Sequence, residues 1–231
     1  MVNYRHLFFD LDRTLWDYDL NAALALQEVF ENYKLQSLFN DFDNFKSKFE
    51  KYNDQVWEDY VLGLIKKNDL RILRFELLLK DCGVIDYELA VSLNRDYLKI
   101  CPMKTNLISG AIELLEYLKD KRYHLYILTN GFTHIQEKKM SASGLNPYFL
   151  KLFSSDKSGH TKPQRAMFEN AIKSVNARKK ESLMIGDDLK IDILGAKTFG
   201  IDQVYYNPSK AIHSETVTYE INFLQEMKEF L

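Results

Sequence analysis

Two carboxylates stand two residues apart near the N-terminus, within the segment FFDLDRT at residues 8–14. The apolar residues before them indicate the end of a buried strand. Because strand side chains at i and i+2 share a face, Asp10 and Asp12 are predicted to point the same way, with a metal or a proton between their negative charges. Mg²⁺ is a suitable metal, since it takes carboxylate and phosphate oxygens as ligands. The alternative interpretation is a pair of solvated turn residues, because Asp is common in turns.

Polar residues follow two further apolar segments in the same way. Thr129 and Asn130 come directly after the apolar segment 123–128, and Asp187 and Asp188 come shortly after the segment 183–185. In parallel sheets the carboxyl ends of the strands lie at one edge, and ligands bind beyond that edge. We therefore expect these residues to converge with the two N-terminal carboxylates.

Lys162 precedes Pro163, where a helix over 163–175 is predicted to begin with proline in its first turn. A Lys-Pro pair alone is a weak signal. Beside several carboxylates and a phosphate, however, Lys162 would supply the positive charge that such a site requires. His160 lies in the same segment and is interpreted as a surface residue without a role.

The elements that must position these side chains fall into two blocks. Residues 17–101 predict an all-helical block, with helices over 21–33, 42–60, 69–80 and 86–100. An aromatic stripe at three- and four-residue spacing marks the second helix, and such a stripe more often packs in a core than stacks on bases. Its members are Phe42, Phe45, Phe49, Tyr52 and Val56.

After Pro102, helical and strand patterns alternate. Strands are expected at 123–128, 149–154, 183–185 and 203–206, with helices at 112–118, 135–143, 163–175, 191–199 and 223–230. Alternation of this kind predicts an α/β fold, with a Rossmann-like parallel sheet covered by helices on both faces. The expected domains are an α/β core formed by 1–16 and 102–231, and an inserted helical domain at 17–101.

Composition excludes several classes of function. The chain has 231 residues, 46% of them hydrophobic and 28% charged, with a formal net charge of -2. Without a basic field, a nucleic acid polymer or an anionic membrane is not expected as a partner. No apolar stretch approaches the ~20 residues of a membrane helix, and no signal segment is evident, so a cytoplasmic protein is expected. Cys82 and Cys101 form no C-x-x-C pair and are interpreted as free thiols.

The order and spacing of these motifs resemble the haloacid dehalogenase superfamily of phosphotransferases. The similarity covers the whole chain, and the helical block resembles the inserted cap of the family. Arg13 stands where Gly is often found, which we interpret as a change on the solvent side. The four motifs are matched by residues 10–14, by residues 128–131, by Lys162-Pro163 and by Gly186-Asp187-Asp188-x-x-x-Asp192.

The resemblance implies a Mg²⁺-dependent phosphomonoester hydrolase. Asp10 would attack phosphorus to form an aspartyl-phosphate, and Asp12 would protonate the leaving alcohol and then deprotonate water. Asp10, the backbone carbonyl of Asp12 and Asp187 would hold Mg²⁺, with Asp188 as an outer ligand.

The remaining motif residues would bind the phosphoryl group. Thr129 and the adjacent backbone amides, including that of Asn130, would donate hydrogen bonds to its oxygens. Lys162 would offset the negative charge, and Asp192 would orient Lys162 from behind.

Residues 128–133 and 187–195 most resemble bacterial pyrimidine 5′-nucleotidases, so a small phosphorylated metabolite, and specifically a pyrimidine nucleoside 5′-monophosphate, is the expected substrate. Trp16, Tyr18, Trp57 and Tyr60 are candidates for stacking on the base. The alternatives are a sugar-phosphate phosphatase or a phosphomutase of the same superfamily. A dehalogenase proper would not need Asp12, because a halide leaves without a proton. A phospho-accepting signalling or binding module fits less well, because its accepting Asp lies on a later strand. The sequence leaves the oligomeric state open.

Overall fold

The computed structural model describes residues 4–231. The chain divides into two compact units, one formed by Met1–Tyr18 with Thr105–Leu231 and the other by Asp19–Lys104. We call them the core unit and the helical unit. The boundaries of the helical unit lie two or three residues C-terminal to the expected range of 17–101.

The helical unit contains the predicted helices. They are α1 (Tyr18–Asn32), α2 (Phe42–Val61), α3 (Lys67–Asp81) and α4 (Tyr87–Ile100), with short 3-10 turns η1 (Leu35–Ser37) and η2 (Cys101–Met103). Asp41 and Asp86 begin α2 and α4, because their side chains accept hydrogen bonds from backbone N–H groups that the first helical turn leaves unpaired. The helix starts are therefore set by local sequence.

The buried face of α2 differs from the predicted stripe, in which Phe42 is only half-buried. Asn53, not Tyr52, is buried on this face, and Tyr52 is only half-buried. The reason is a polar centre in the helical unit: the Arg74 guanidinium donates to the side-chain oxygens of Asn53 at 3.0 Å and Asn94 at 3.2 Å. A buried arginine requires such acceptors, and an aromatic stripe cannot reveal that requirement.

The core unit contains a six-stranded sheet in the order β3-β2-β1-β4-β5-β6, and every neighbouring pair is parallel. The predicted parallel sheet is confirmed. Its strands are β1 (His6–Phe9), β2 (His124–Thr129), β3 (Lys151–Ser154), β4 (Ser182–Gly186), β5 (Asp202–Tyr206) and β6 (Tyr219–Ile221). The edge strand β6 was not predicted, because three residues are too few to show a period.

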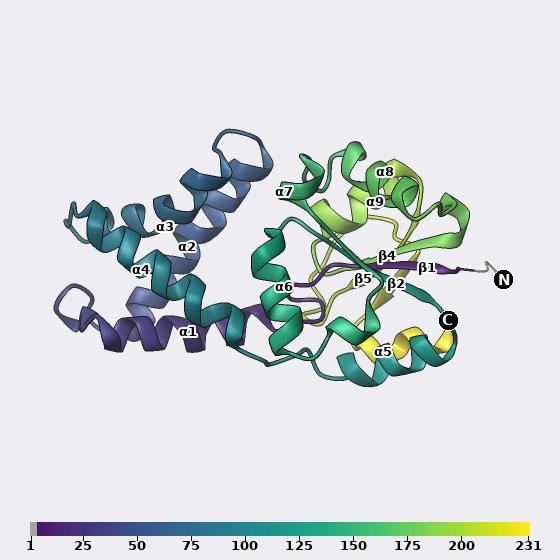
Figure 1. Ribbon diagram of the computed structural model, residues 1–231, viewed down its shortest axis with the longest axis horizontal. Coiled ribbons are helices and arrows are strands. Elements are labelled where there is room, and N and C mark those ends of the chain that lie inside the picture. Colours follow the sequence, from purple (N-terminus) through teal and green to yellow (C-terminus); the bar gives the residue numbers. More distant parts are fainter. Residues whose placement is uncertain (1–3) are drawn as a thin grey trace. The chain divides into compact units, whose positions relative to one another are not determined.

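Helices cover both faces of the sheet, with α8 (Arg165–Ser174) and α9 (Gly195–Phe199) on one face and α5 (Ala111–Asp120) on the other (Figure 1). Phe8 and Met184 from the sheet share a buried cluster with Phe168 of α8 and Phe199 of α9. On α5, the Tyr117 hydroxyl donates to the carbonyl of Leu231 at 2.8 Å. This contact ties the C-terminal end of the chain to α5.

Three predicted helices differ from expectation. The helix after Lys162 begins at Arg165, since residues 161–164 form a turn in which Gln164 N–H donates to the Thr161 carbonyl at 2.8 Å. The segment expected as one helix over 191–199 is a π-helix, η5 (Leu189–Leu194), followed by α9. The C-terminal helix is the 3-10 helix η6 (Leu224–Glu229).

The remaining elements are α6 (Thr133–Ala142), α7 (Ser155–Ser158), η3 (Asn146–Tyr148) and η4 (Lys179–Glu181). Over residues 4–231, no helix combines the length and the apolar character that crossing a bilayer demands.

Candidate active site

The carboxyl ends of β1, β2 and β4 lie side by side in the middle of the sheet. Phe9 pairs with Ile127 on one side and with Ile185 on the other, and Asp10 N–H continues this pattern by donating to the Ile185 carbonyl at 2.8 Å. The backbone of β1 thus carries Asp10 past the end of the strand in a fixed position. Asp10 is 8% exposed, and Thr129, at the end of β2, is 2% exposed.

Lys162 lies almost completely buried at this edge, with 1% of its surface exposed. Its Nζ is 2.5 Å from Asp10 Oδ1 and 2.6 Å from Asp192 Oδ1. A Cβ on Gly195 would lie 2.8 Å from Pro163 Cβ, so glycine at this position lets the loop of Lys162 pack closely against α9. The loop therefore delivers a buried ammonium group between two carboxylates.

Asn130 holds this loop from β2. Its side-chain oxygen accepts from the Lys162 backbone N–H at 2.7 Å, and its side-chain nitrogen donates to the Lys162 carbonyl at 3.0 Å. Both ends of the amide are thus engaged with the backbone of Lys162. A contact of Asn130 with phosphate would therefore have to come from its backbone N–H.

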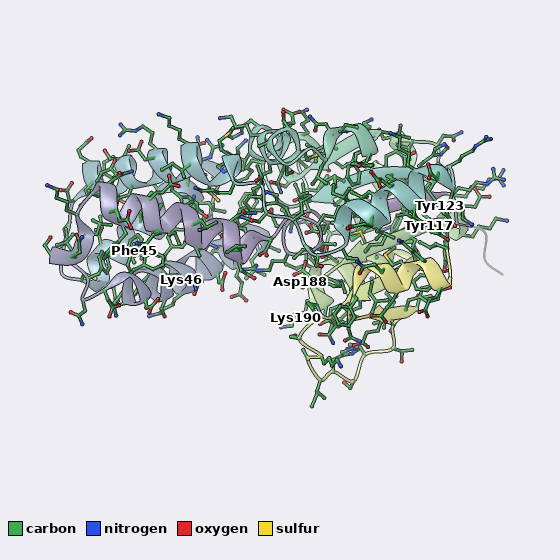
Figure 2. All side chains as sticks on the ribbon, turned by 90° about the horizontal axis from the view of Figure 1, so that it is seen from below. Phe45, Lys46, Tyr117, Tyr123, Asp188 and Lys190 are labelled. Atoms are coloured by element: carbon green, nitrogen blue, oxygen red, sulfur yellow. The ribbon has the colours of Figure 1, made fainter. Side chains whose placement is uncertain are left out.

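Asp187 and Asp188 follow β4 and have different surroundings. Asp187 Oδ1 accepts from the hydroxyl of Thr14 at 2.9 Å, and Thr14 is fully buried. Asp188 Oδ1 accepts from the N–H groups of Lys190 at 2.9 Å and Ile191 at 2.8 Å, which begins η5 (Figure 2). The side chain expected as an outer metal ligand therefore caps a helix.

Asp10, Asp187 and Asp192 form a cluster in which one carboxylate oxygen of each lies within 4.8 Å of the others. Burial raises the pKa of Asp10 to about 7, against the opposing charge of Lys162. Burial and the charge of Asp10 raise the pKa of Asp187 to about 7. For Asp192 burial raises the pKa to about 6, again opposed by Lys162. Burial alone would lower the pKa of Lys162, but Asp10 and Asp192 together raise it.

These shifts indicate more negative charge than Lys162 can balance. An oxygen-rich, buried and acidic cluster has the donor set that a hard divalent cation such as Mg²⁺ prefers. The cluster fits this ion. It also contains Asp192, which the sequence suggested only as support for Lys162.

Asp12 does not contact Lys162, the lysine that is paired with Asp10, but a different lysine. Its Oδ1 lies 2.6 Å from Lys139 Nζ, and its Oδ2 accepts from Gln136 Nε2 at 2.8 Å. Each of the two carboxylates contacts a lysine of its own, so their negative charges do not depend on a shared metal or proton alone. The turn between Asp12 and Thr14 uses Arg13 at φ 65°, in the left-handed region that favours glycine, with Arg13 exposed as expected.

Sequence reasoning missed Thr14 as a partner of Asp187, and Gln136 and Lys139 as partners of Asp12. Gln136 and Lys139 stand three residues apart in a helix, which places them on one face. That spacing alone did not distinguish them from the polar residues around them. Trp16, a candidate for stacking on a base, is fully buried and cannot serve that purpose.

Comparison with known proteins agrees with this geometry. The profile of the haloacid dehalogenase-like hydrolases matches residues 4–200. The crystal structure of the putative HAD-hydrolase YfnB from Bacillus subtilis, bound to magnesium, superposes with a TM-score of 0.89 at 32% identity and covers 98% of each chain.

Several curated relatives carry names that specify a substrate, and two of them differ in that substrate. Pyrimidine 5′-nucleotidase PynA of Streptococcus pneumoniae is 33% identical over 99% of this chain and 95% of its own length. Ribulose-1,5-bisphosphate 5-phosphatase of Halopiger xanaduensis is 30% identical over 88% of this chain and 85% of its own length. The sequence motifs, the parallel sheet and these matches agree, and the chain belongs to the haloacid dehalogenase-like hydrolases.

Proposed function

We propose that this hydrolase is a Mg²⁺-dependent phosphomonoesterase that forms an aspartyl-phosphate on Asp10. The observation that carries the proposal is the different environment of its two N-terminal carboxylates. Asp10 is buried against Lys162 and belongs to the acidic cluster with Asp187 that fits Mg²⁺, whereas Asp12 contacts Lys139 and Gln136. Such a pair suits one nucleophile and one proton carrier.

Asp10, Asp187 and the backbone carbonyl of Asp12 would hold Mg²⁺. When bound, the ion supplies charge neutralisation for the carboxylates and the phosphoryl oxygens. Lys162 would add a second positive charge close to the nucleophile, with Asp192 orienting it and Asn130 fixing its backbone. Thr129 and the adjacent backbone amides would donate hydrogen bonds to the phosphoryl oxygens.

The reaction would proceed in two displacements at phosphorus. In the first, an oxygen of Asp10 bonds to phosphorus while the bond to the leaving oxygen breaks, and Asp12 gives its proton to that oxygen. In the second, Asp12 takes a proton from water, whose oxygen bonds to phosphorus while the bond to Asp10 breaks. Inorganic phosphate leaves and both carboxyl groups return to their starting states.

For the substrate we propose a pyrimidine nucleoside 5′-monophosphate. The similarity to PynA over nearly the full length of both chains supports this substrate. Of the aromatic candidates, Trp57 and Tyr60 are half-buried in the helical unit, with ring centres 5.8 Å apart in an edge-to-face arrangement. Base stacking on one such ring is worth roughly 1–3 kcal/mol.

A sugar phosphate is the second candidate, and the similarity to a sugar-bisphosphate phosphatase favours it. The ratio of kcat/KM for uridine or thymidine monophosphate to that for ribose, glyceraldehyde and ribulose phosphates separates the two, because discrimination lies in that ratio. A preference for the sugar phosphates by tenfold or more would replace the proposed substrate and leave the assignments of Asp10 and Asp12 unchanged.

The covalent step has a direct test. Rapid acid quenching of the enzyme with Mg²⁺ and substrate, followed by peptide mass spectrometry, should find phosphate on Asp10. The Asp10→Asn variant should show no phosphorylated peptide and no turnover. Turnover at the wild-type rate in that variant would exclude the mechanism.

A further inference from the structure

Gln136 and Lys139 hold both oxygens of Asp12 from one face of α6. Gln136 is 0% exposed and Lys139 is 5% exposed, although the two residues between them in the helix, Glu137 and Lys138, are exposed. The contacts are 2.6 Å from Lys139 Nζ to Oδ1 and 2.8 Å from Gln136 Nε2 to Oδ2. Two separate donors thus fix the position and the plane of the carboxylate.

The ammonium of Lys139 is itself supported by the turn that carries Asp12. It lies 4.3 Å from the ring centre of Trp16, which attracts a cation to its face. The backbone of Trp16 is bound to the same turn. Its backbone N–H donates to the Leu11 carbonyl at 2.8 Å, and its backbone carbonyl accepts from Arg13 N–H at 2.9 Å. Lys139 therefore connects α6 to the turn after β1 through its ion pair with Asp12 and its cation–π contact with Trp16.

Gln136 also contacts the hydroxyl of Thr129, which we proposed as a donor to the phosphoryl group. Its Nε2 donates to Thr129 Oγ1 at 2.9 Å, and Gly131 N–H donates to the same oxygen at 3.0 Å. These bonds use both lone pairs of the hydroxyl, which leaves its proton to be donated elsewhere. A Cβ on Gly131 would lie 2.3 Å from Gln136 Nε2, so glycine makes room for this close approach.

The start of α6 provides a firm base for these contacts. Asp156 accepts from Thr133 N–H at 3.0 Å and from the Thr133 hydroxyl at 2.7 Å. The first turn is thus anchored only three residues before Gln136. Because rigid elements position functional groups more accurately than loops do, α6 is suited to hold Asp12.

We propose that Gln136 and Lys139 are positioning residues that hold Asp12 at the leaving oxygen for proton transfer, and that Gln136 also orients the Thr129 hydroxyl as a donor. The proposal rests on the function proposed above, in which Asp12 is the proton carrier. Without these two donors, the Asp12 side chain would be free to rotate, and the proton would no longer lie in line with the breaking bond.

Leaving-group dependence tests this inference, because p-nitrophenolate leaves without a proton whereas an alkoxide does not. In Lys139→Met, kcat/KM for an alkyl phosphate should fall about 10- to 100-fold, the size of a misplaced catalytic group. For p-nitrophenyl phosphate it should fall less than about threefold. For both substrates kcat/KM reports steps up to the formation of the aspartyl-phosphate, so slow hydrolysis of that species does not obscure the comparison.

Lys138→Met is the matched control, since Lys138 is exposed and adjacent on the same helix. This variant should leave kcat/KM unchanged for both the alkyl phosphate and p-nitrophenyl phosphate. Lys139→Arg, which keeps a cation, should recover part of the activity on the alkyl phosphate. Gln136→Met is the second variant should Lys139→Met not fold, and it should show the same selective loss with a higher KM, because Thr129 also loses a donor.

Asp12→Asn separates the failure of this inference from the failure of the proposed function. If Asp12→Asn lowers kcat/KM equally for both substrates, Asp12 is not the proton carrier and the proposed function fails at that residue. If Asp12→Asn selectively lowers kcat/KM for the alkyl phosphate but Lys139→Met and Gln136→Met do not, the positioning role is overturned and Asp12 keeps its role. An equal fall in kcat/KM for both substrates in Lys139→Met, with a lower melting temperature, would also overturn the positioning role in favour of a purely structural one.

Discussion

Replacing Asp187 with Asn should make the metal-free protein more stable and remove its response to Mg²⁺. Asp187 is half-buried near Asp10, and burial with the charge of Asp10 raises its pKa to about 7. Its carboxylate is therefore held in the folded state at an energetic cost. Asn has the same shape, can still accept the hydrogen bond from Thr14, and carries no charge.

The direction of the pH effect follows from this pKa. The folded state binds the proton of Asp187 more tightly than the unfolded state, so the contribution of this group to stability is full below about pH 4 and is lost as the pH rises through about 7. A rise from 3.8 to about 7 corresponds to about 4 kcal/mol at alkaline pH. Because the side chain is partly exposed and water screens its charge, we expect about half of this value, roughly 2 kcal/mol.

The assay is thermal unfolding in EDTA, followed by the same measurement with Mg²⁺. For a chain of this size, roughly 2 kcal/mol raises the melting temperature by about 4–8 °C, which is the expected gain of Asp187→Asn near pH 8. Near pH 5 the gain should be less than about half as large. Mg²⁺ should stabilise the wild type and leave the variant nearly unchanged, since ligand binding to the folded state raises stability.

Asp120→Asn is the control, because Asp120 is exposed at the end of α5. Its melting temperature should follow the wild type at both pH values. A melting temperature of Asp187→Asn at or below that of the wild type near pH 8, or a difference that does not grow with pH, would refute the reasoning about the acidic cluster.

Three further outcomes are expected. Asp10→Asn should keep the fold and remove turnover, since an amide cannot attack phosphorus; near-UV circular dichroism and a phosphate-release assay check both halves, and retained turnover would contradict the assignment. Lys162→Met should lower the free energy of unfolding by about 3–5 kcal/mol near pH 8 and by less near pH 5, where the carboxyl groups take up protons; denaturant titration at the two pH values measures this, and equal losses would argue against the ion pairs. Gly195→Ala places a Cβ 2.8 Å from Pro163 Cβ and should cost about 1–3 kcal/mol while lowering kcat by displacing Lys162; unchanged kcat would show that the loop tolerates the shift.

The sequence alone determined the fold class and the main residues of the candidate site. Alternating apolar segments and helical periods predict a parallel sheet, and in such a sheet the residues after β1, β2 and β4 must meet at one edge. Asp10, Thr129 and Asp187 are therefore predicted together from the sequence. Helix starts at Asp41 and Asp86 are equally local, because capping depends on residues within one turn.

Only the tertiary structure decided which side chains contact one another within that edge. The ion pair of Asp12 with Lys139 joins residues 127 positions apart, and the side chain of Asn130 turns to the backbone of Lys162. In the helical unit, Asn53 is buried because Arg74 needs its oxygen. Sequence periods follow from backbone geometry, which repeats along the chain. Pairings between distant side chains depend on how the packed elements orient them and on which buried charges need partners, and no local pattern records either one.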